Sequence, residues 1–260
     1  MKERMNRILA FALTSALAVM PAAASSQENQ PPLFLMGDFL IDISRTADYE
    51  DAVKELLANL KTHGFPFVLD TYSTDDSHYY VIYSMNGYAG ADAWFKAWAE
   101  ISQKMGPENY RALHERLAAA EIERVYQFWI FRPDISFLPE KERLKPEEIG
   151  YYTWDFVWLA PGKEAEFEAV NKEWIALSAA KKALDPFMTY QGGLGTKMPV
   201  YVWFEYGKSA ADYAAAEEKF WEALGEDGAA LSKKTRTLIM KMETKTGRYR
   251  PDLSYTPKSK

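Results

Sequence analysis

A short sequence motif, here called the RPD phrase, occurs twice in the chain. RPDISF occupies Arg132–Phe137 and RPDLSY occupies Arg250–Tyr255, 118 positions further on. Three dipeptide pairs recur in the same order at offsets of 117 to 120: Asp38-Phe39 with Asp155-Phe156, Pro66-Phe67 with Pro186-Phe187, and Ala91-Asp92 with Ala211-Asp212. Matches in one order at nearly one offset predict an internal duplication, and a duplicated chain must build the same supersecondary unit twice.

Each half opens on a strand pattern and continues with a helix pattern. Phe39 and Ile41 alternate with polar or smaller neighbours, as Phe156 and Trp158 do in the second half, which is the period of a strand. Apolar residues then recur at helical spacing, up to Gly64 in the first half and to Leu177 in the second.

The remaining patterns add two strands, a helical region and a final strand to each half. The two strands of the first half are FPFVLDTY and HYYVIYSM, and those of the second half are PFMTYQ and VYVWFEY. The helical region of the first half consists of WFKAWAEISQKM and NYRALHERLAAAEI, and that of the second half runs from ADYAAAEEKFWEAL to LSKKTRTLIMKM. VYQFWIF and ETKTGRY are the last strands. We interpret the RPD phrase as the turn that leaves this strand, because proline ends strand pairing.

The order β-α-β-β-α-β, stated twice, predicts an α+β fold built from two tandem ferredoxin-like repeats. Each repeat leaves one sheet face bare, so we expect the two sheets to pack face to face as an intramolecular α+β barrel. The expected organisation is a signal peptide over 1–24, an N-terminal linker over 25–32, repeat 1 over 33–137, a charged linker over 138–148, repeat 2 over 149–255 and a tail over 256–260.

With this element order and duplication, the chain resembles the dimeric α+β barrel superfamily, whose members include NIPSNAP-like, antibiotic-biosynthesis-monooxygenase-like and chlorite-dismutase-like proteins. The resemblance spans nearly all of residues 33–255. It implies a substrate or haem site between the sheets. A chlorite-dismutase-like protein is expected to carry a proximal histidine in its second repeat, but His63, His78 and His114 all lie in the first. We therefore predict no cofactor.

The first 24 residues have the form of a secretory signal. MKERMNR is basic, a 13-residue apolar run ILAFALTSALAVM follows, and Ala22–Ala24 forms a cleavage site. The run is too short to span a membrane. We expect cleavage near Ala24 and a periplasmic or secreted protein without a membrane anchor.

The net charge and the lack of cysteine exclude some classes of binding partner and of covalent bond. The chain has a formal net charge of −6 and no cysteine, so it forms no disulfide and repels nucleic acid and anionic lipid. We predict a small-molecule ligand and no nucleic-acid partner, and we leave homo-oligomer formation open.

Strand alternation gives the candidate pocket residues. If Phe39 faces the helices, the alternate positions face the interior between the sheets. The candidates are Asp38, Asp155, Tyr80, Ser84, Tyr201, Trp203 and Glu205. Such a lining suits a small planar or weakly cationic ligand, although the sheets are equally able to pack with these acids in water. We expect Asp38 and Asp155 to lie near the pseudo-two-fold axis of the barrel and to repel each other, so at least one should have a raised pKa unless Arg, Lys or a hydrogen-bond donor compensates. The alternative is that these carboxylates only hold backbone turns.

Other motifs give weak signals. We expect His114 to be a helix-surface or hydrogen-bonded core histidine. Asp75, Asp76 and His78 offer too few ligands for a metal, and we predict no metal site. GGLG at 192–195 lacks the setting of a dinucleotide loop.

Three functions follow. The first is an exported protein that binds a small hydrophobic or aromatic molecule in the barrel cavity. The second is a cofactor-free monooxygenase- or isomerase-like enzyme that uses the same cavity, so whether the chain is an enzyme stays open. The third is a structural protein with a filled barrel.

Overall fold

The computed structural model describes residues 32–257. These residues form an α+β protein whose eight strands have the order of a closed barrel, β1-β3-β2-β8-β5-β7-β6-β4. Pairing is antiparallel between β1 and β3, β2 and β3, β5 and β7, β5 and β8, and β6 and β7. The α+β class predicted from the sequence is confirmed, and the predicted signal peptide lies outside the described residues.

The chain divides into two compact units. The first, here called the α2 unit, contains residues 32–129 and 248–257, and the second, the α5 unit, contains residues 130–247. The end of each half of the sequence therefore belongs to the unit built by the other half. The predicted repeat and linker bounds stay predictions, because the compact units exchange these end segments.

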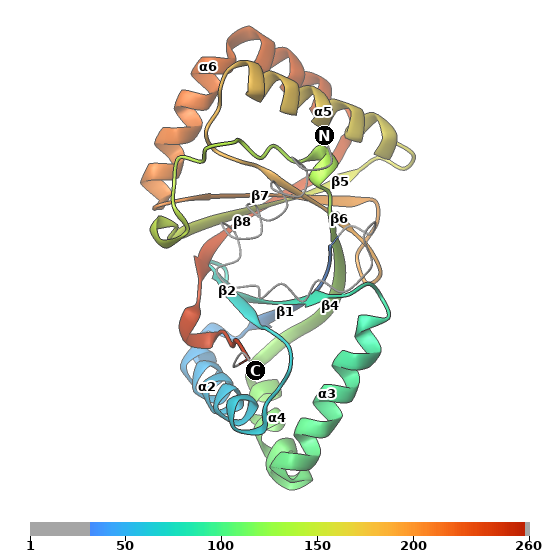
Figure 1. The fold of residues 1–260 in the computed structure, drawn as a ribbon, viewed down its shortest axis with the longest axis vertical. Helices are drawn as coiled ribbons and strands as arrows, with labels where there is room; N and C mark the ends of the chain where they lie inside the picture. Colours follow the sequence, from blue (N-terminus) through green and yellow to red (C-terminus); the bar gives the residue numbers. More distant parts are fainter. Residues whose placement is uncertain (1–31, 258–260) are drawn as a thin grey trace. The chain divides into compact units, whose positions relative to one another are not determined.

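The α2 unit carries three helices on one face of its strands (Figure 1). Its elements are β1 (Leu33–Ile41), α2 (Thr46–His63), β2 (Asp70–Thr74), β3 (His78–Met85), α3 (Gly90–Met105), α4 (Pro107–Ala120), most of β4 (Glu121–Phe131) and the 3-10 turn η4 (Pro251–Leu253).

Local sequence explains the helix ends. In α2, Tyr49, Ala52, Leu56 and Leu60 are buried at helical spacing, and Gly64 ends the helix in the left-handed conformation, with its N–H bonded to the Leu60 carbonyl. The predicted Gly-Pro break is also present, since α3 ends at Met105 and α4 begins at Pro107.

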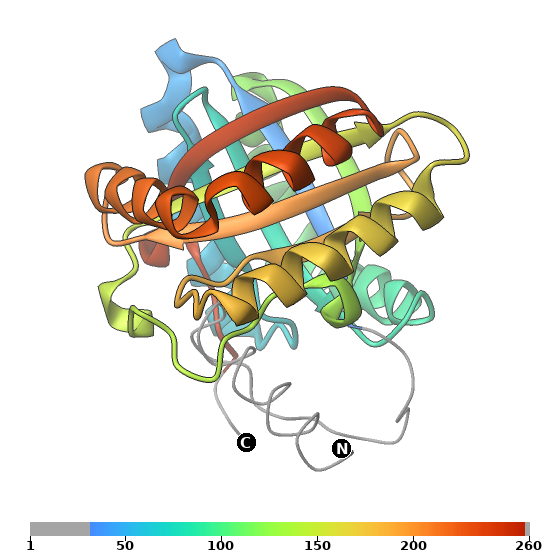
Figure 2. The same cartoon turned by 90° about the horizontal axis from the view of Figure 1, so that it is seen from above.

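The α5 unit carries two helices that run side by side across one face of its strands (Figures 1 and 2). Its elements are η2 (Pro133–Ile135), η3 (Pro146–Glu148), β5 (Tyr151–Leu159), α5 (Glu164–Ala180), β6 (Met188–Gly192), β7 (Val200–Gly207), α6 (Ala210–Arg236) and most of β8 (Ile239–Tyr249). Helix α6 kinks at Gly225, where φ is 55°.

The final strands are longer than predicted. β4 begins at Glu121 and β8 at Ile239, so residues that the helical spacing assigned to the preceding helix are extended instead. Short apolar runs such as LIMKM fit either period, which explains the error.

The RPD phrase of the second half is held in the α2 unit by hydrogen bonds and an ion pair. Arg250 donates to both carboxylate oxygens of Glu50, with an Nη2–Oε2 distance of 2.7 Å, and to Asp252 at 2.9 and 2.7 Å. The Tyr79 hydroxyl donates to the same Glu50 carboxylate at 2.7 Å. The Thr71 hydroxyl donates to the Leu253 carbonyl at 2.6 Å.

The RPD phrase of the first half fastens to the α5 unit in the same way. Arg132 donates to Glu168 at 2.6 and 2.9 Å and to Asp134 at 2.9 and 2.8 Å. The Tyr201 hydroxyl donates to Glu168 at 3.0 Å, and the Thr189 hydroxyl donates to the Ile135 carbonyl at 2.8 Å. Both phrases are turns that leave a strand, as the sequence predicted, and each turn is held by a bidentate arginine–glutamate pair.

Candidate functional site

The α2 unit encloses a cavity of about 350 Å³ between its sheet and its helices. Strands β1 to β4 supply one wall, and α2, α3 and α4 supply the other. The main lining side chains are Phe39, Tyr49, Val81, Tyr83, Trp94, Phe95, Trp98, Tyr110, His114, Glu121, Arg124 and Tyr126. The lining is therefore mostly aromatic.

A continuous row of rings forms the helix side of this cavity. Tyr83 contacts Trp94 with ring centroids 5.5 Å apart, Trp94 contacts Trp98 at 6.1 Å, and Trp98 contacts His114 at 6.5 Å. Trp94 and Trp98 are four positions apart on α3, so one face of that helix presents both rings. Phe95 is 65% exposed although it lines the same cavity, which places it at the mouth.

One ion pair and one histidine supply charge. Arg124 donates from Nε to Glu121 Oε2 at 2.7 Å, its Nη2 lies 2.7 Å from the same oxygen in an ion pair, and its guanidinium lies 5.7 Å from the Phe39 ring centroid. His114 lies with its ring centroid 4.2 Å from that of Tyr110. Burial, and then the positive charge of Arg124, lower the pKa of His114, so its imidazole is neutral at pH 7.

Several polar groups of this cavity have no partner within residues 32–257. Trp94 Nε1, Trp98 Nε1 and His114 Nε2 are buried without a hydrogen bond. A buried donor or acceptor left unpaired costs about 1 to 3 kcal/mol. The expectation of a hydrogen-bonded or surface His114 is therefore wrong, because its Nε2 is enclosed by the aromatic row.

Two positions that line this cavity carry larger side chains in the α5 unit, where they pack against the core. The Tyr79–Glu50 hydrogen bond of the α2 unit is equivalent to the Tyr201–Glu168 hydrogen bond of the α5 unit. Val81 and Trp203 each lie two positions after the tyrosine, so they occupy equivalent positions. Trp174 lies 118 positions after Leu56 and is its equivalent. Both of these larger side chains are fully paired.

Each of the two tryptophans has a hydrogen-bond partner in its own unit. Trp203 donates to Asn171 at 3.0 Å and stacks on Phe167 at 5.6 Å, while Trp174 donates to Thr235 at 2.9 Å. The two tryptophans of the α5 unit are thus hydrogen-bonded, whereas Trp94 and Trp98 beside the cavity of the α2 unit are not.

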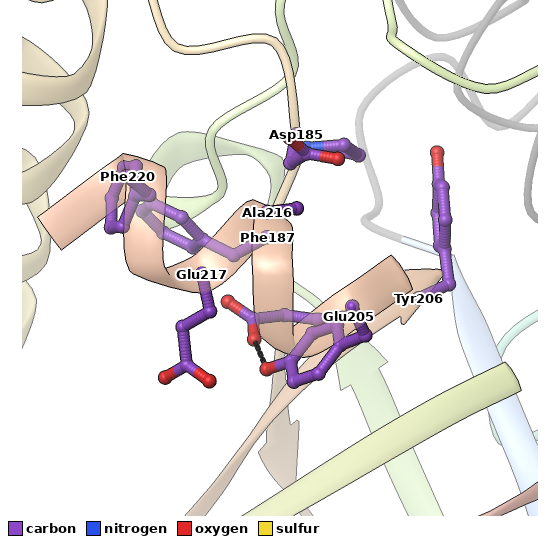
Figure 3. Close-up of a pocket in the computed structure, with 9 residues that line it drawn as sticks. Asp185, Phe187, Glu205, Tyr206, Ala216, Glu217 and Phe220 are labelled. Carbon is purple, nitrogen blue, oxygen red and sulfur yellow. Dashed lines mark hydrogen bonds between the residues drawn. The ribbon is translucent and has the colours of Figure 1, made fainter. Parts of the chain in front are cut away.

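A second, smaller cavity of about 40 Å³ lies in the α5 unit beside Glu205 (Figure 3). The dashed line in Figure 3 marks the hydrogen bond that Glu205 accepts from the Tyr213 hydroxyl. Burial raises the pKa of Glu205 to about 7. The rest of the lining consists of Asp185, Pro186, Phe187, Tyr206, Ala216, Glu217 and Phe220.

The structure places the predicted residues of the first half on the face away from the helices. Asp38 lies opposite Tyr80 in the strand register, and Ser84 lies opposite Phe34. Asp38 Oδ1 is 2.6 Å from His78 Nδ1, and Tyr80 is 1% exposed. Phe39 and Tyr83 point to the helices instead, as expected from alternation. A pocket role for Asp38, Tyr80 and Ser84 stays a prediction.

The inside-or-outside assignment of the second half was wrong. Tyr201 and Trp203 pack on Phe167 of α5, and Glu205 bonds to Tyr213 of α6. These three residues therefore face their own helices.

Asp155 lies on the same helix-facing side. It lies opposite Trp203 in the register and accepts a hydrogen bond from Thr244 at 2.5 Å; directly opposed strand residues share a face. Its pKa is raised, as expected, but chiefly by burial and then by Glu217, not by Asp38.

A one-residue slip explains this error. The sequence comparison matched Asp38 with Asp155 at an offset of 117. The backbone hydrogen bonds of the first strands repeat at 118, since Asp42 bonds Ala120 and Ala160 bonds Leu238. A shift of one residue moves every side chain of a strand to the opposite face.

Neither a metal cluster nor a membrane-spanning helix is present in the described part of the chain. No group of three or more His, Cys, Asp or Glu side chains there is placed to hold a metal ion. Within residues 32–257, no helix combines the length and apolarity needed to cross a bilayer.

Comparison with known proteins identifies the fold but not a family. No model of a protein family matches the sequence, and no curated protein matches it. An anthrone oxidase-like protein superposes with a TM-score of 0.60 at 10% identity, covering 85% of this chain and 92% of that one.

Two candidate monooxygenases superpose almost as well. The protein from Fusobacterium nucleatum subsp. nucleatum gives a TM-score of 0.53 at 11% identity, covering 85% of this chain and 93% of that one. The protein from Lactobacillus acidophilus NCFM gives 0.52 at 10% identity, covering 87% and 97%. At 10 to 11% identity these likenesses show the fold alone, which is an α+β barrel.

Proposed function

We propose that the protein binds a small planar aromatic molecule in the cavity of the α2 unit. The contrast between the two units carries this proposal. Trp203 and Trp174 pack against the core of the α5 unit, whereas Val81 and Leu56 at the matching positions line a cavity of about 350 Å³. Buried volume normally closes up because cavities cost packing energy, so an open aromatic cavity with unpaired polar atoms points to a ligand.

The volume supports a ligand of more than one ring. An engineered apolar cavity of about 150 Å³ binds benzene, and this cavity of about 350 Å³ is more than twice that size. The row of rings from Tyr83 to His114 provides faces for stacking.

A second candidate is a monooxygenase- or isomerase-like enzyme that uses the same cavity. The fold neighbours described as monooxygenases and as anthrone oxidase-like support it. So does the neutral His114 imidazole beside the cavity, because a neutral imidazole accepts a proton from a bound substrate. Native mass spectrometry separates the two functions: a binding protein retains its ligand unchanged, whereas an enzyme converts it and, if a monooxygenase, consumes O₂.

Filling the cavity tests the proposed site. Val81→Trp installs the residue that fills the α5 unit, and we expect it to weaken binding of the fluorescent probe N-phenyl-1-naphthylamine at least about tenfold, since it occupies the ligand's volume. Leu194→Trp, at a turn position that is 62% exposed, is the control that adds a tryptophan elsewhere. A folded Val81→Trp protein that binds the probe as tightly as the parent chain contradicts the proposal.

We also propose export, from the basic and apolar N-terminal sequence. N-terminal sequencing of the protein from an extracellular or periplasmic fraction is expected to begin close to Ser25. A chain that starts at Met1 and is recovered only from the cytoplasm contradicts this.

A further inference from the structure

The polar groups around the cavity of the α2 unit are mostly hydrogen-bond donors. The indole N–H groups of Trp94 and Trp98 can only donate, and so can the guanidinium of Arg124. The carboxylate of Glu121 already accepts from Arg124. A ligand that satisfies this wall must therefore bring acceptors.

Tyrosine hydroxyls strengthen this donor character. Tyr49 and Tyr83 line the cavity, are 3% and 4% exposed, and their hydroxyls form no hydrogen bond within residues 32–257. Tyr110 and Tyr126, which also line the cavity, likewise have no hydroxyl partner in that part of the chain. Burial raises the pKa of all four hydroxyls, so each keeps its proton at neutral pH and can donate it.

These groups converge on one part of the cavity. Tyr83 and Tyr126 both contact the Trp94 ring, at 5.5 and 5.8 Å. Tyr126 and Arg124 both contact the Phe39 ring, at 5.8 and 5.7 Å. The hydroxyl of Tyr126 is also close enough to that of Tyr83 to affect its ionisation, and Arg124 acts on Tyr126, so an oxygen atom bound here can approach both hydroxyls and the guanidinium.

The charges around this place favour a negative ligand. The titratable groups that face it are Arg124 and Glu121 on β4, Tyr110 and His114 on α4, Tyr49 on α2, and Tyr83 and Tyr126 on the strands. His114 is neutral, and Glu121 is the single carboxylate among the cavity's lining residues. Arg124 has a larger effect than Glu121 on the pKa of Tyr126, whereas Glu121 has the larger effect on the pKa of Tyr49. A negative oxygen is therefore favoured on the Tyr126 side of the cavity.

We infer that the ligand is an aromatic phenol or enol bound as its anion, with its oxygen accepting hydrogen bonds from Tyr83 and its neighbouring hydroxyls. This inference rests on the proposed function of the same cavity. Hydrogen bonds to a charged acceptor are stronger than those between neutral groups, and the proton released by the ligand passes to bulk water. Tyr83 and Arg124 would thus select ionisable ligands over their ethers.

A matched pair of probes tests the inference. 4-Nitrophenol ionises to a yellow anion, whereas 4-nitroanisole has nearly the same shape and cannot ionise. At a pH where free 4-nitrophenol is mostly neutral, we expect added protein to turn it yellow and to bind it at least about tenfold more tightly than 4-nitroanisole in equilibrium dialysis.

Single substitutions test which hydrogen-bond donors cause the preference for 4-nitrophenol over 4-nitroanisole. Tyr83→Phe is expected to reduce this preference about tenfold, and Arg124→Gln serves as a second variant if the first fails to fold. Tyr88→Phe is the matched control and should leave the preference unchanged, because the Tyr88 ring packs at a tilt against Phe128 and is not part of the cavity lining.

The outcomes separate the two proposals. If 4-nitrophenol binds but stays colourless, or if 4-nitroanisole binds as well, the anion inference is wrong while the cavity remains a binding site. If Tyr83→Phe and Arg124→Gln both keep the full preference, the assignment to this wall is overturned. If neither probe binds and N-phenyl-1-naphthylamine also fails to bind, the proposed function itself fails.

Discussion

Replacing Arg250 by methionine is expected to destabilise the protein by about 3 to 5 kcal/mol, because it leaves a partly buried carboxylate without its partner. The Arg250 and Glu50 side chains are only 10% and 18% exposed, and the arginine also bonds Asp252. For a chain of this size the loss corresponds to a fall in melting temperature of roughly 10 °C. Thermal unfolding followed by circular dichroism measures it.

A surface ion pair is the control for this prediction. Arg116 and Glu55 are paired at side-chain exposures of 52% and 50%, and Arg116→Met should cost less than about 1 kcal/mol. Adding Glu50→Gln to Arg250→Met should recover part of the loss, since the unpaired charge is removed. Equal losses for Arg250→Met and Arg116→Met would show that the RPD turn does not fasten the α2 unit.

Stability is expected to fall by about 3 kcal/mol between pH 4.5 and 7 through the single carboxyl of Glu205. Burial raises its pKa from 4.5 to about 7, and the negative charges of Asp155 and Glu217 add to this effect. Because the folded state holds the proton more tightly than the unfolded state, the stabilisation is complete below pH 4.5 and is lost as the pH rises through 7.

Glu205→Gln should therefore flatten this part of the profile, and at pH 8 the variant should be more stable than the parent chain. Urea unfolding at several pH values gives the two slopes. The exposed Glu218 provides the control substitution Glu218→Gln, which should keep the original slope. A Glu205→Gln profile parallel to that of the parent chain would mean that Glu205 is ionised in the folded protein at acidic pH.

Element order was predictable because it depends on local period. The strand HYYVIYSM was placed at 78–85, where β3 lies, and the Gly-Pro break between α3 and α4 was also found. The side of the sheet on which the side chains of the second half lie was not predictable, since the Asp-Phe match gives an offset of 117 and the RPD match gives 118. A difference of one residue moves every side chain of a strand to the opposite face.

The cavity escaped prediction for a different reason. A Val81 in a strand and a Trp203 in its counterpart are both ordinary sheet residues, and only the packed structure shows which one leaves space. Trp94 and Trp98 were visible as part of a helical pattern, but aromatic residues at that spacing commonly fill a core. The signal that was available was the imbalance between the halves, with Tyr110 and His114 in one matched to Gly228 and Ser232 in the other.

The end of each half of the sequence belongs to the unit built by the other half, which affects how the chain folds while the ribosome makes it. The Thr71 hydroxyl bonds a carbonyl 182 positions away, so the α2 unit cannot be completed until almost the whole chain has been made. At about 5 to 20 residues per second, the ribosome takes roughly 10 to 40 s to cover that interval. During this time β2 exposes an unpaired edge, and closing so long a loop slows folding further. A nascent chain of this design therefore depends on chaperones for longer than one whose halves close independently.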